Sequence, residues 1–238
     1  MLSVLRELFS DIPMLLLRIP VILLALSMHE AAHGFAAYKM GDPTARNMGR
    51  LTLNPLKHLD PIGTLMMFVF GFGWARPVPI NPRYFKDPKK GMAFSAAAGP
   101  IANLLLGLIG LFCANLFWFV MVKIGVLFEM DGAMYANTDS AFVVNLISYT
   151  HTFFYLFYML NVSLGVFNLL PVPPLDGSRI FLSFLPAQLY FKIMRYEHII
   201  QIVLMLGLWM GFLDTPLRAA VSFVMRGMEW LVGLIPIF

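Results

Sequence analysis

Two stretches of this chain stay apolar for longer than a membrane-spanning helix requires. Met92–Val122 and Ala141–Leu170 contain no Lys, Arg, Asp or Glu, and a span needs about 20 predominantly apolar residues. Of the whole sequence, 59% is hydrophobic and only 13% is charged, whereas soluble domains are about 25% charged. The chain is therefore predicted to be an integral membrane protein, with the lipid bilayer as its surroundings.

Three further segments extend this prediction to a polytopic all-α fold. Met14–Tyr38 is apolar enough to span the bilayer. Ile199–Leu213 and Leu217–Ile235 are expected to form a final helical hairpin, with a turn at residues 214–216 that contains proline. The sequence thus predicts about five transmembrane helices.

The segment Pro61–Trp74 is apolar but does not fit a span. As a helix its 14 residues would reach only about 21 Å, short of the roughly 30 Å hydrocarbon core. Its three glycines weaken a helix, and its Phe and Val residues favour a strand. We expect a short re-entrant strand or loop element near residues 61–80, shielded from lipid by protein.

The distribution of basic residues sets the expected topology. From Lys39 to Met92 there are nine Lys or Arg, Lys39 included, and they share one side of the membrane if Pro61–Trp74 enters and returns. The positive-inside rule makes that side cytoplasmic and the N-terminus external, in a multi-pass protein of the cell membrane. The formal charge of +4 is thus explained by membrane topology, and no nucleic-acid partner is expected.

The strongest chemical signal is the run His29-Glu30-Ala31-Ala32-His33, an H-E-x-x-H pattern. On a helix its two imidazoles share a face about 6 Å apart along the axis, so that both can bind one Zn²⁺. Glu30 then lies beside the water that the zinc activates and can act as its base. The pattern also occurs by chance in soluble helices, but ionisable groups within a span are rarely kept without a function.

A catalytic zinc usually has three protein ligands and one open position. The candidates for the third ligand are His58, Asp60, His151, Asp176 and His198. Asp176 is favoured, because three prolines before it stop the helix and Gly177 permits a turn after it; the alternative is an ordinary turn. With a re-entrant Pro61–Trp74, Asp176 emerges on the same membrane face as His29 and His33.

These motifs resemble the site-2 protease family of intramembrane zinc metalloproteases, in its compact bacterial branch without PDZ or CBS domains. The resemblance covers Ser27 to about Arg179. The matching stretches are His29–His33, Gly41–Thr44, Leu51–Pro55, Gly73–Asn81, Gly99–Asn103 and Asn168–Gly177.

The resemblance implies one zinc held by His29, His33 and Asp176, with Glu30 as the catalytic base. It also implies a strand-like element before Gly73 that holds an unwound substrate segment. Asn168 and Asn103 are candidates for polarising the scissile carbonyl or stabilising its oxyanion. Helix–helix hydrogen bonding in lipid is an equally good explanation of both asparagines.

The predicted function is zinc-dependent hydrolysis of peptide bonds in transmembrane, membrane-anchored or signal-peptide-like substrates. One metalloprotease domain is expected over residues 1–238, with its core at 12–180 and a C-terminal hairpin at 197–236. Two alternatives remain open. A metal-binding transporter would need a polar path through several helices, and a catalytically silent scaffold would have no use for Glu30.

Overall fold

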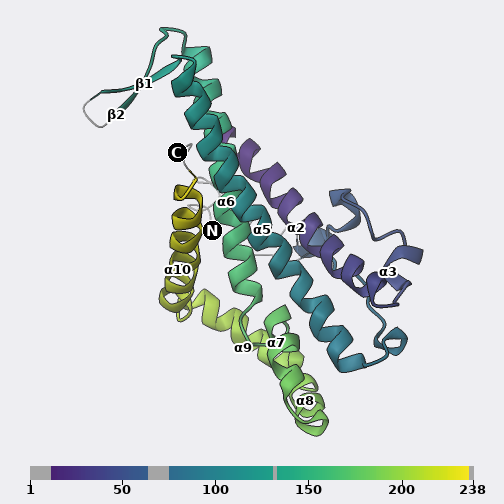
Figure 1. Cartoon of the computed structure of the whole chain (residues 1–238). Coiled ribbons are helices and arrows are strands. Elements are labelled where there is room, and N and C mark those ends of the chain that lie inside the picture. The colour runs from purple at the N-terminus through teal and green to yellow at the C-terminus, as the bar shows by residue number, and fades with distance from the viewer. Residues whose placement is uncertain (1–11, 64–74, 131–132, 236–238) are drawn as a thin grey trace.

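Three long helices form the body of the molecule in the computed structural model, which describes residues 12–63, 75–130 and 133–235. These helices are α2 (Ile12–Lys39), α5 (Pro88–Lys123) and α6 (Ala141–Asn168). Each is long and apolar enough to cross a membrane, and α5 packs against both of the others (Figure 1). The polytopic all-α class is confirmed.

Small residues let α5 and α6 approach closely. A Cβ atom at Gly107 of α5 would lie 2.7 Å from Cγ2 of Val162, and one at Gly165 of α6 would lie 3.1 Å from the carbonyl oxygen of Pro100. Without a hydrophobic driving force between helices in lipid, such close contacts supply much of the association energy. The same approach brings buried polar side chains of α5 and α6 within hydrogen-bonding distance.

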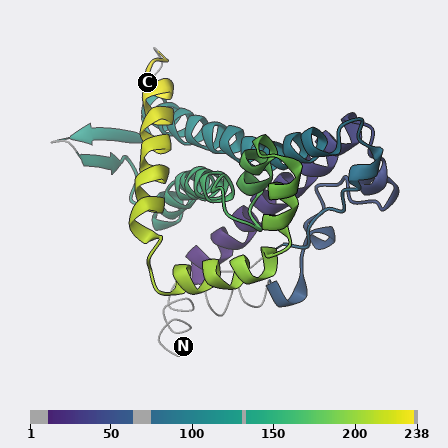
Figure 2. The same cartoon turned by 90° about the horizontal axis from the view of Figure 1, so that it is seen from below.

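The C-terminal part consists of α7 (Asp176–Phe181), α8 (Ala187–Met194), α9 (Glu197–Trp209) and α10 (Asp214–Gly233). Helices α9 and α10 meet at 86°, and the view from below shows α6 inside the corner that they form (Figure 2). The shorter elements are α3 (Thr44–Asn47) and the 3₁₀ turns η1 (Pro55–Lys57), η2 (Pro82–Tyr84) and η3 (Leu182–Phe184).

The prediction of two final spans is wrong, because α9 and α10 together make at most one broken span. Three helices qualify individually, so the described chain has three or four candidate spans instead of five. Helix α9 has 13 residues and reaches only about 20 Å. Helix α10 carries four charged residues, Asp214, Arg218, Arg226 and Glu229, which are costly in lipid.

A polar contact docks α10 on the bundle. Tyr158 of α6 is fully buried, and its hydroxyl lies 3.1 Å from the carbonyl oxygen of Met225 and 3.3 Å from Oε1 of Glu229. Leu111, Val162 and Val232 pack around the Tyr158 ring. The charge of Glu229 thus has a partner within the protein.

A two-stranded antiparallel sheet was not predicted from the sequence. Strands β1 (Leu127–Met130) and β2 (Ala133–Ala136) connect α5 to α6. They lie at the end of the bundle opposite α7 (Figure 1). The Asp131-Gly132 pair between the strands is the sequence signal for such a hairpin.

The two ends of the expected re-entrant segment lie side by side. Leu59 forms an antiparallel bridge with Ala75, and the Arg76 N–H donates to the carbonyl oxygen of His58 at 2.7 Å. Residues 58–59 and 75–76, on either side of this segment, therefore lie next to each other. The strand-like path expected for Pro61–Trp74 lies, from residue 64 onward, outside the described residues.

The glycine contacts predict opposite effects for two matched substitutions. Gly107→Ala should lower stability by about 1 kcal/mol, because the overlap with Val162 outweighs the better helix propensity of alanine. Gly227→Ala in α10 meets nothing within 4 Å and should raise stability by up to about 1 kcal/mol. Thermal unfolding in detergent, followed by tryptophan fluorescence, measures both, and shifts of the same sign would contradict the packing described.

Candidate metal centre

Helix α2 presents His29, Glu30 and His33 to the interior of the bundle. All three side chains are buried, and the two imidazoles are one helical turn apart, with ring centroids 4.5 Å from each other. The i and i+4 spacing places them on the same face of the helix, as the H-E-x-x-H pattern predicts.

Asp176 reaches the histidines from the far end of α6. The helix ends at Asn168, and the proline-rich segment 171–174 redirects the chain until α7 begins at Asp176. Gly177 is required here, because a Cβ atom on it would lie 2.2 Å from the carbonyl oxygen of Leu169. The expected turn thus holds the Asp176 carboxylate against α2.

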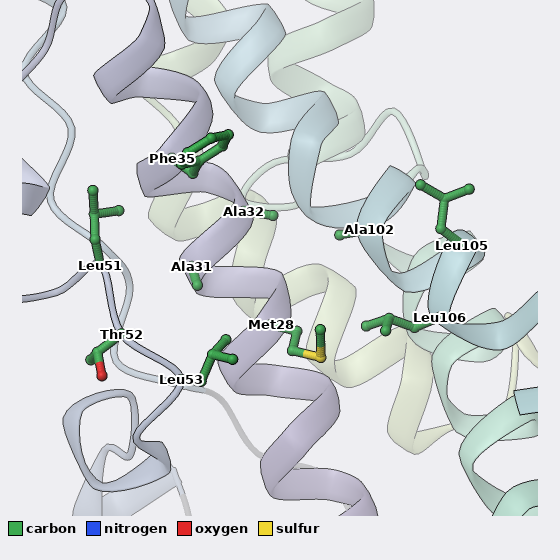
Figure 3. Close-up of a pocket in the computed structure, with 10 residues that line it drawn as sticks. All are labelled: Met28, Ala31, Ala32, Phe35, Leu51, Thr52, Leu53, Ala102, Leu105 and Leu106. Atoms are coloured by element: carbon green, nitrogen blue, oxygen red, sulfur yellow. The ribbon is translucent and has the colours of Figure 1, made fainter. Parts of the chain in front are cut away.

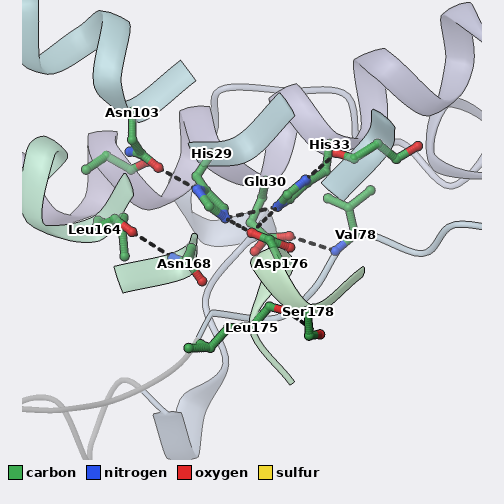
Figure 4. Close-up of polar contacts among 12 residues, drawn as sticks. His29, Glu30, His33, Val78, Asn103, Leu164, Asn168, Leu175, Asp176 and Ser178 are labelled. Atoms are coloured by element: carbon green, nitrogen blue, oxygen red, sulfur yellow. Dashed lines mark hydrogen bonds and ion pairs between the residues drawn. The ribbon is translucent and has the colours of Figure 1, made fainter. Parts of the chain in front are cut away.

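Three donor atoms converge on one point (Figure 4). Oδ2 of Asp176 lies 3.1 Å from Nε2 of His29 and 3.2 Å from Nε2 of His33. The two Nε2 atoms are 2.9 Å apart. Among the described residues this is the one group of three His, Cys, Asp or Glu side chains arranged to hold a metal ion.

The opposite ring nitrogens fix how the imidazoles are protonated. Nδ1 of His33 lies 2.7 Å from the carbonyl oxygen of Ser95, which can only accept, so this nitrogen carries the hydrogen. Nδ1 of His29 contacts Oδ1 of Asn103. The Asn103 amide nitrogen donates to Oδ1 of Asn161 at 2.7 Å and faces the Ala25 carbonyl oxygen at 3.4 Å, so its Oδ1 accepts from His29.

Both Nε2 atoms consequently direct lone pairs at the Asp176 carboxylate. Two lone pairs and a negative charge this close repel each other unless a cation lies between them. Two imidazole nitrogens and one carboxylate oxygen that line a cavity form a donor set that fits catalytic Zn²⁺. The backing of each imidazole by an acceptor is the usual second layer of such sites.

Gly99 of α5 provides the space for the two rings. A Cβ atom at this position would lie 2.4 Å from Cε1 of His33 and 2.7 Å from Cε1 of His29. Any larger residue would displace the imidazoles from Asp176. This close approach explains why glycine stands four residues before Asn103 in the same helix.

A cavity of about 500 Å³ opens at His29, His33 and Asp176. Glu30 lines it, and Oε2 of Glu30 accepts the Val78 N–H at 2.8 Å. Its other walls are mainly apolar and include Leu26, Met92, Ala96, Leu164 and Phe167. Arg179 of α7 and Glu197 of α9 form an ion pair of 3.5 Å on the same lining, so α9 closes one side of the cavity.

The two candidate asparagines lie in different places. Asn168 lines the cavity, and its Nδ2 donates to the Leu164 carbonyl oxygen at 3.0 Å. Asn103 is fully buried behind His29, where its geometry favours orienting an imidazole over contact with a substrate. Sequence reasoning missed Asn161, Ser95 and Val78.

The other candidate ligands lie apart from this group. His58 is buried and contacts the Thr52 carbonyl oxygen at 2.8 Å. Asp60 accepts the Gly63 N–H at 2.8 Å, and His151 lies among aromatic rings, 4.8 Å from Trp118 between centroids. His198 does not belong to the cluster of metal-ligating groups.

A second hollow lies on the other face of α2 (Figure 3) and offers no comparable chemistry. None of its lining residues is titratable. They are Met28, Ala31, Ala32, Phe35, Leu51, Thr52, Leu53, Ala102, Leu105 and Leu106.

The comparison with known families decides the classification. The sequence model of peptidase family M50 matches residues 18–213. The chain belongs to peptidase family M50. The resemblance to the site-2 proteases that the motifs indicated is confirmed.

Three relatives of this M50 chain are named as zinc metalloproteases. YwhC of Bacillus subtilis (strain 168), named as a zinc metalloprotease, is 41% identical over 192 residues, which are 81% of this chain and 80% of YwhC. Rip2 of Mycolicibacterium smegmatis, named likewise, is 30% identical over 161 residues, which are 65% of this chain and 52% of Rip2. Rip2 of Mycobacterium tuberculosis (strain H37Rv) is 27% identical over 162 residues, with the same coverage of 65% and 52%. No solved structure matches the chain significantly.

The contact between Asn103 and Nδ1 of His29 can be tested by substitution of Asn103. Asn103→Leu should weaken zinc binding by about 10- to 100-fold, because the His29 ring loses the acceptor that orients it. Asn103→Asp keeps an oxygen opposite Nδ1 and should recover much of that loss. Competition with a zinc chelator in detergent measures both affinities, and equal affinities for wild type and Asn103→Leu would contradict an orienting role.

Proposed function

We propose that this M50 chain is a zinc-dependent endopeptidase that hydrolyses membrane-protein substrates within or near the bilayer. The observation that carries the proposal is the convergence of His29, His33 and Asp176 beside Glu30 on one cavity. Family membership supports peptidase chemistry, and the names of YwhC and Rip2 support zinc as the cofactor.

His29, His33 and Asp176 hold the zinc in this proposal, and Glu30 is the general base. When bound, zinc lowers the pKa of a water toward about 7 and polarises the scissile carbonyl. One carboxylate oxygen of Glu30, Oε2, is engaged by the Val78 N–H. The other oxygen, Oε1, takes the proton of the attacking water and passes it to the leaving amine.

The cavity wall supports an apolar substrate in an extended conformation. A transmembrane helix hides its carbonyl groups in its own hydrogen bonds, so that attack requires local unwinding. Ala75, Pro77, Val78 and Ile80 line the cavity in a stretch without helix, and we propose that the unwound segment lies against this stretch. Asn168 lines the same cavity and is proposed to contact the scissile carbonyl.

The depth of the site supports cleavage at the membrane. His29 lies ten residues before the end of α2 at Lys39, which corresponds to about 15 Å along the axis. The basic loop that follows Lys39 supports a cytoplasmic position for this end by the positive-inside rule, with the N-terminus outside. We propose that the catalytic groups lie within the bilayer, nearer its cytoplasmic face, in a single metalloprotease unit of a bacterial cell membrane.

The two alternative functions gain no support. A transporter would require polar groups along a path through the bundle, whereas the buried cluster of Leu111, Tyr158, Val162, Val166 and Val232 is apolar apart from the Tyr158 hydroxyl. The hydrogen bond from the Val78 N–H to the Glu30 carboxylate would have no role in a transporter or in a silent scaffold.

The proposal predicts that Glu30→Gln abolishes cleavage while zinc remains bound, because Glu30 is a base and not a ligand. The rate should fall by at least about 10²- to 10⁴-fold. Cleavage of a model transmembrane peptide in liposomes gives the rate, and metal analysis gives the zinc content.

Asp139→Asn is the matched control, because Asp139 is exposed and lies in the connection at the opposite end of the bundle. It removes a carboxylate without touching the cavity and should cleave as wild type does. Turnover retained by Glu30→Gln would falsify the assignment of the base.

A further inference from the structure

The non-helical segment Ala75–Asn81, here called the strap, is anchored at both ends. At its start the Arg76 N–H donates to the His58 carbonyl oxygen at 2.7 Å. At its end the Asn81 N–H donates to Oδ2 of the fully buried Asp42 at 2.7 Å. Between these anchors the strap passes Glu30 and lines the cavity.

The strap has a single backbone donor at its centre. Pro77 and Pro79 have no N–H group, which leaves only that of Val78 between them. This N–H donates to Oε2 of Glu30 at 2.8 Å. A buried N–H requires an acceptor, and here the acceptor is the carboxylate of the proposed base.

Arg50 holds the other side of the same peptide group. Its side chain is buried, with 7% exposure, and its Nη2 donates to the carbonyl oxygens of Arg76 at 2.6 Å and Pro77 at 3.2 Å. The Pro77 carbonyl and the Val78 N–H belong to one planar peptide unit and point in opposite directions. The guanidinium therefore contacts one end of this unit, and the Glu30 carboxylate contacts the other.

Electrostatics favours this order of groups. The negative end of the peptide dipole faces a cation and its positive end faces an anion, and hydrogen bonds to charged groups are about twice as strong as neutral ones. Burial and the nearby Arg76 charge lower the pKa of Arg50, whereas the Glu30 carboxylate raises it. An arginine remains cationic in any case, so Arg50 and Glu30 attract each other across the strap.

We propose that Arg50 and the Pro77–Val78 peptide group are positioning elements that hold one oxygen of Glu30 and so direct its other oxygen toward the attacking water. This inference rests on the proposed function, in which Glu30 is the base. Neither Arg50 nor Val78 is a catalytic residue, because each acts through Glu30. Zinc binding does not depend on them, because neither contacts His29, His33 or Asp176.

The first test replaces Val78 with proline and with alanine. Val78→Pro removes the donor, whereas Val78→Ala keeps the donor and shortens the side chain. We expect Val78→Pro to lower kcat for a transmembrane peptide in liposomes by about 100-fold, the cost of a misplaced catalytic group, with KM and zinc content unchanged. Val78→Ala should lose far less.

The second test does not depend on how well a proline fits. Arg50→Ala should lower kcat without releasing zinc, and millimolar guanidinium should restore part of the loss by occupying the space of the side chain. Arg50→Lys should be intermediate, since an ammonium lacks the planar fork that spans two carbonyl groups. Arg83→Ala removes an exposed charge and should show neither the loss nor the rescue.

The outcomes separate this inference from the proposed function. If zinc-loaded wild type does not cleave, the proposed function fails. If wild type cleaves and Val78→Pro and Arg50→Ala keep its kcat, the positioning role is wrong. Loss of zinc from both variants, or an increase of KM alone, would also overturn it, because these results place the strap at the metal or at the substrate.

Discussion

Two imidazole nitrogens and a carboxylate oxygen meet inside an apolar helix bundle, and this contact depends on most of the other features of the fold. Polar groups that face each other in a medium of low dielectric must be satisfied or their burial is costly. Helix α5 supplies the acceptors behind both rings, Ser95 and Asn103, and the space beside them at Gly99. Helix α6 returns the chain so that α7 begins with Asp176, whose carboxylate lies against the histidines.

A small number of contacts likewise positions Glu30 beside His29, His33 and Asp176. The strap fixes one oxygen of this carboxylate through a backbone group, and Arg50 fixes the strap. A backbone donor has no rotamers of its own, so it holds the carboxylate with less loss of freedom than a flexible side chain would. Close packing of α5 on α6 through Gly107 and Gly165 makes the surroundings rigid enough for such contacts to define one geometry.

Local patterns predicted the parts of the site that lie close together in sequence or follow a distinctive turn. The i and i+4 histidines share a helical face by geometry alone, and the prolines before Asp176 are visible as a break. The last two spans were overpredicted, because apolar composition did not reveal that α9 is short and sharply bent from α10. Asn161 and Ser95 could not be predicted, since their contacts depend on how α5 and α6 are aligned. The Val78 N–H and the Ser95 carbonyl have no signature at all, because every residue type but proline carries both groups.

X-ray absorption at the zinc edge, recorded on the purified wild type in detergent or liposomes, tests the convergence most directly. We predict two imidazole nitrogens at about 2.0–2.1 Å together with oxygen donors at about 2.0–2.2 Å. The same spectrum of Asp176→Ala should show weakened or absent zinc. A sulfur donor, a single imidazole, or a wild-type spectrum that the loss of Asp176 leaves unchanged would contradict a centre built from His29, His33 and Asp176.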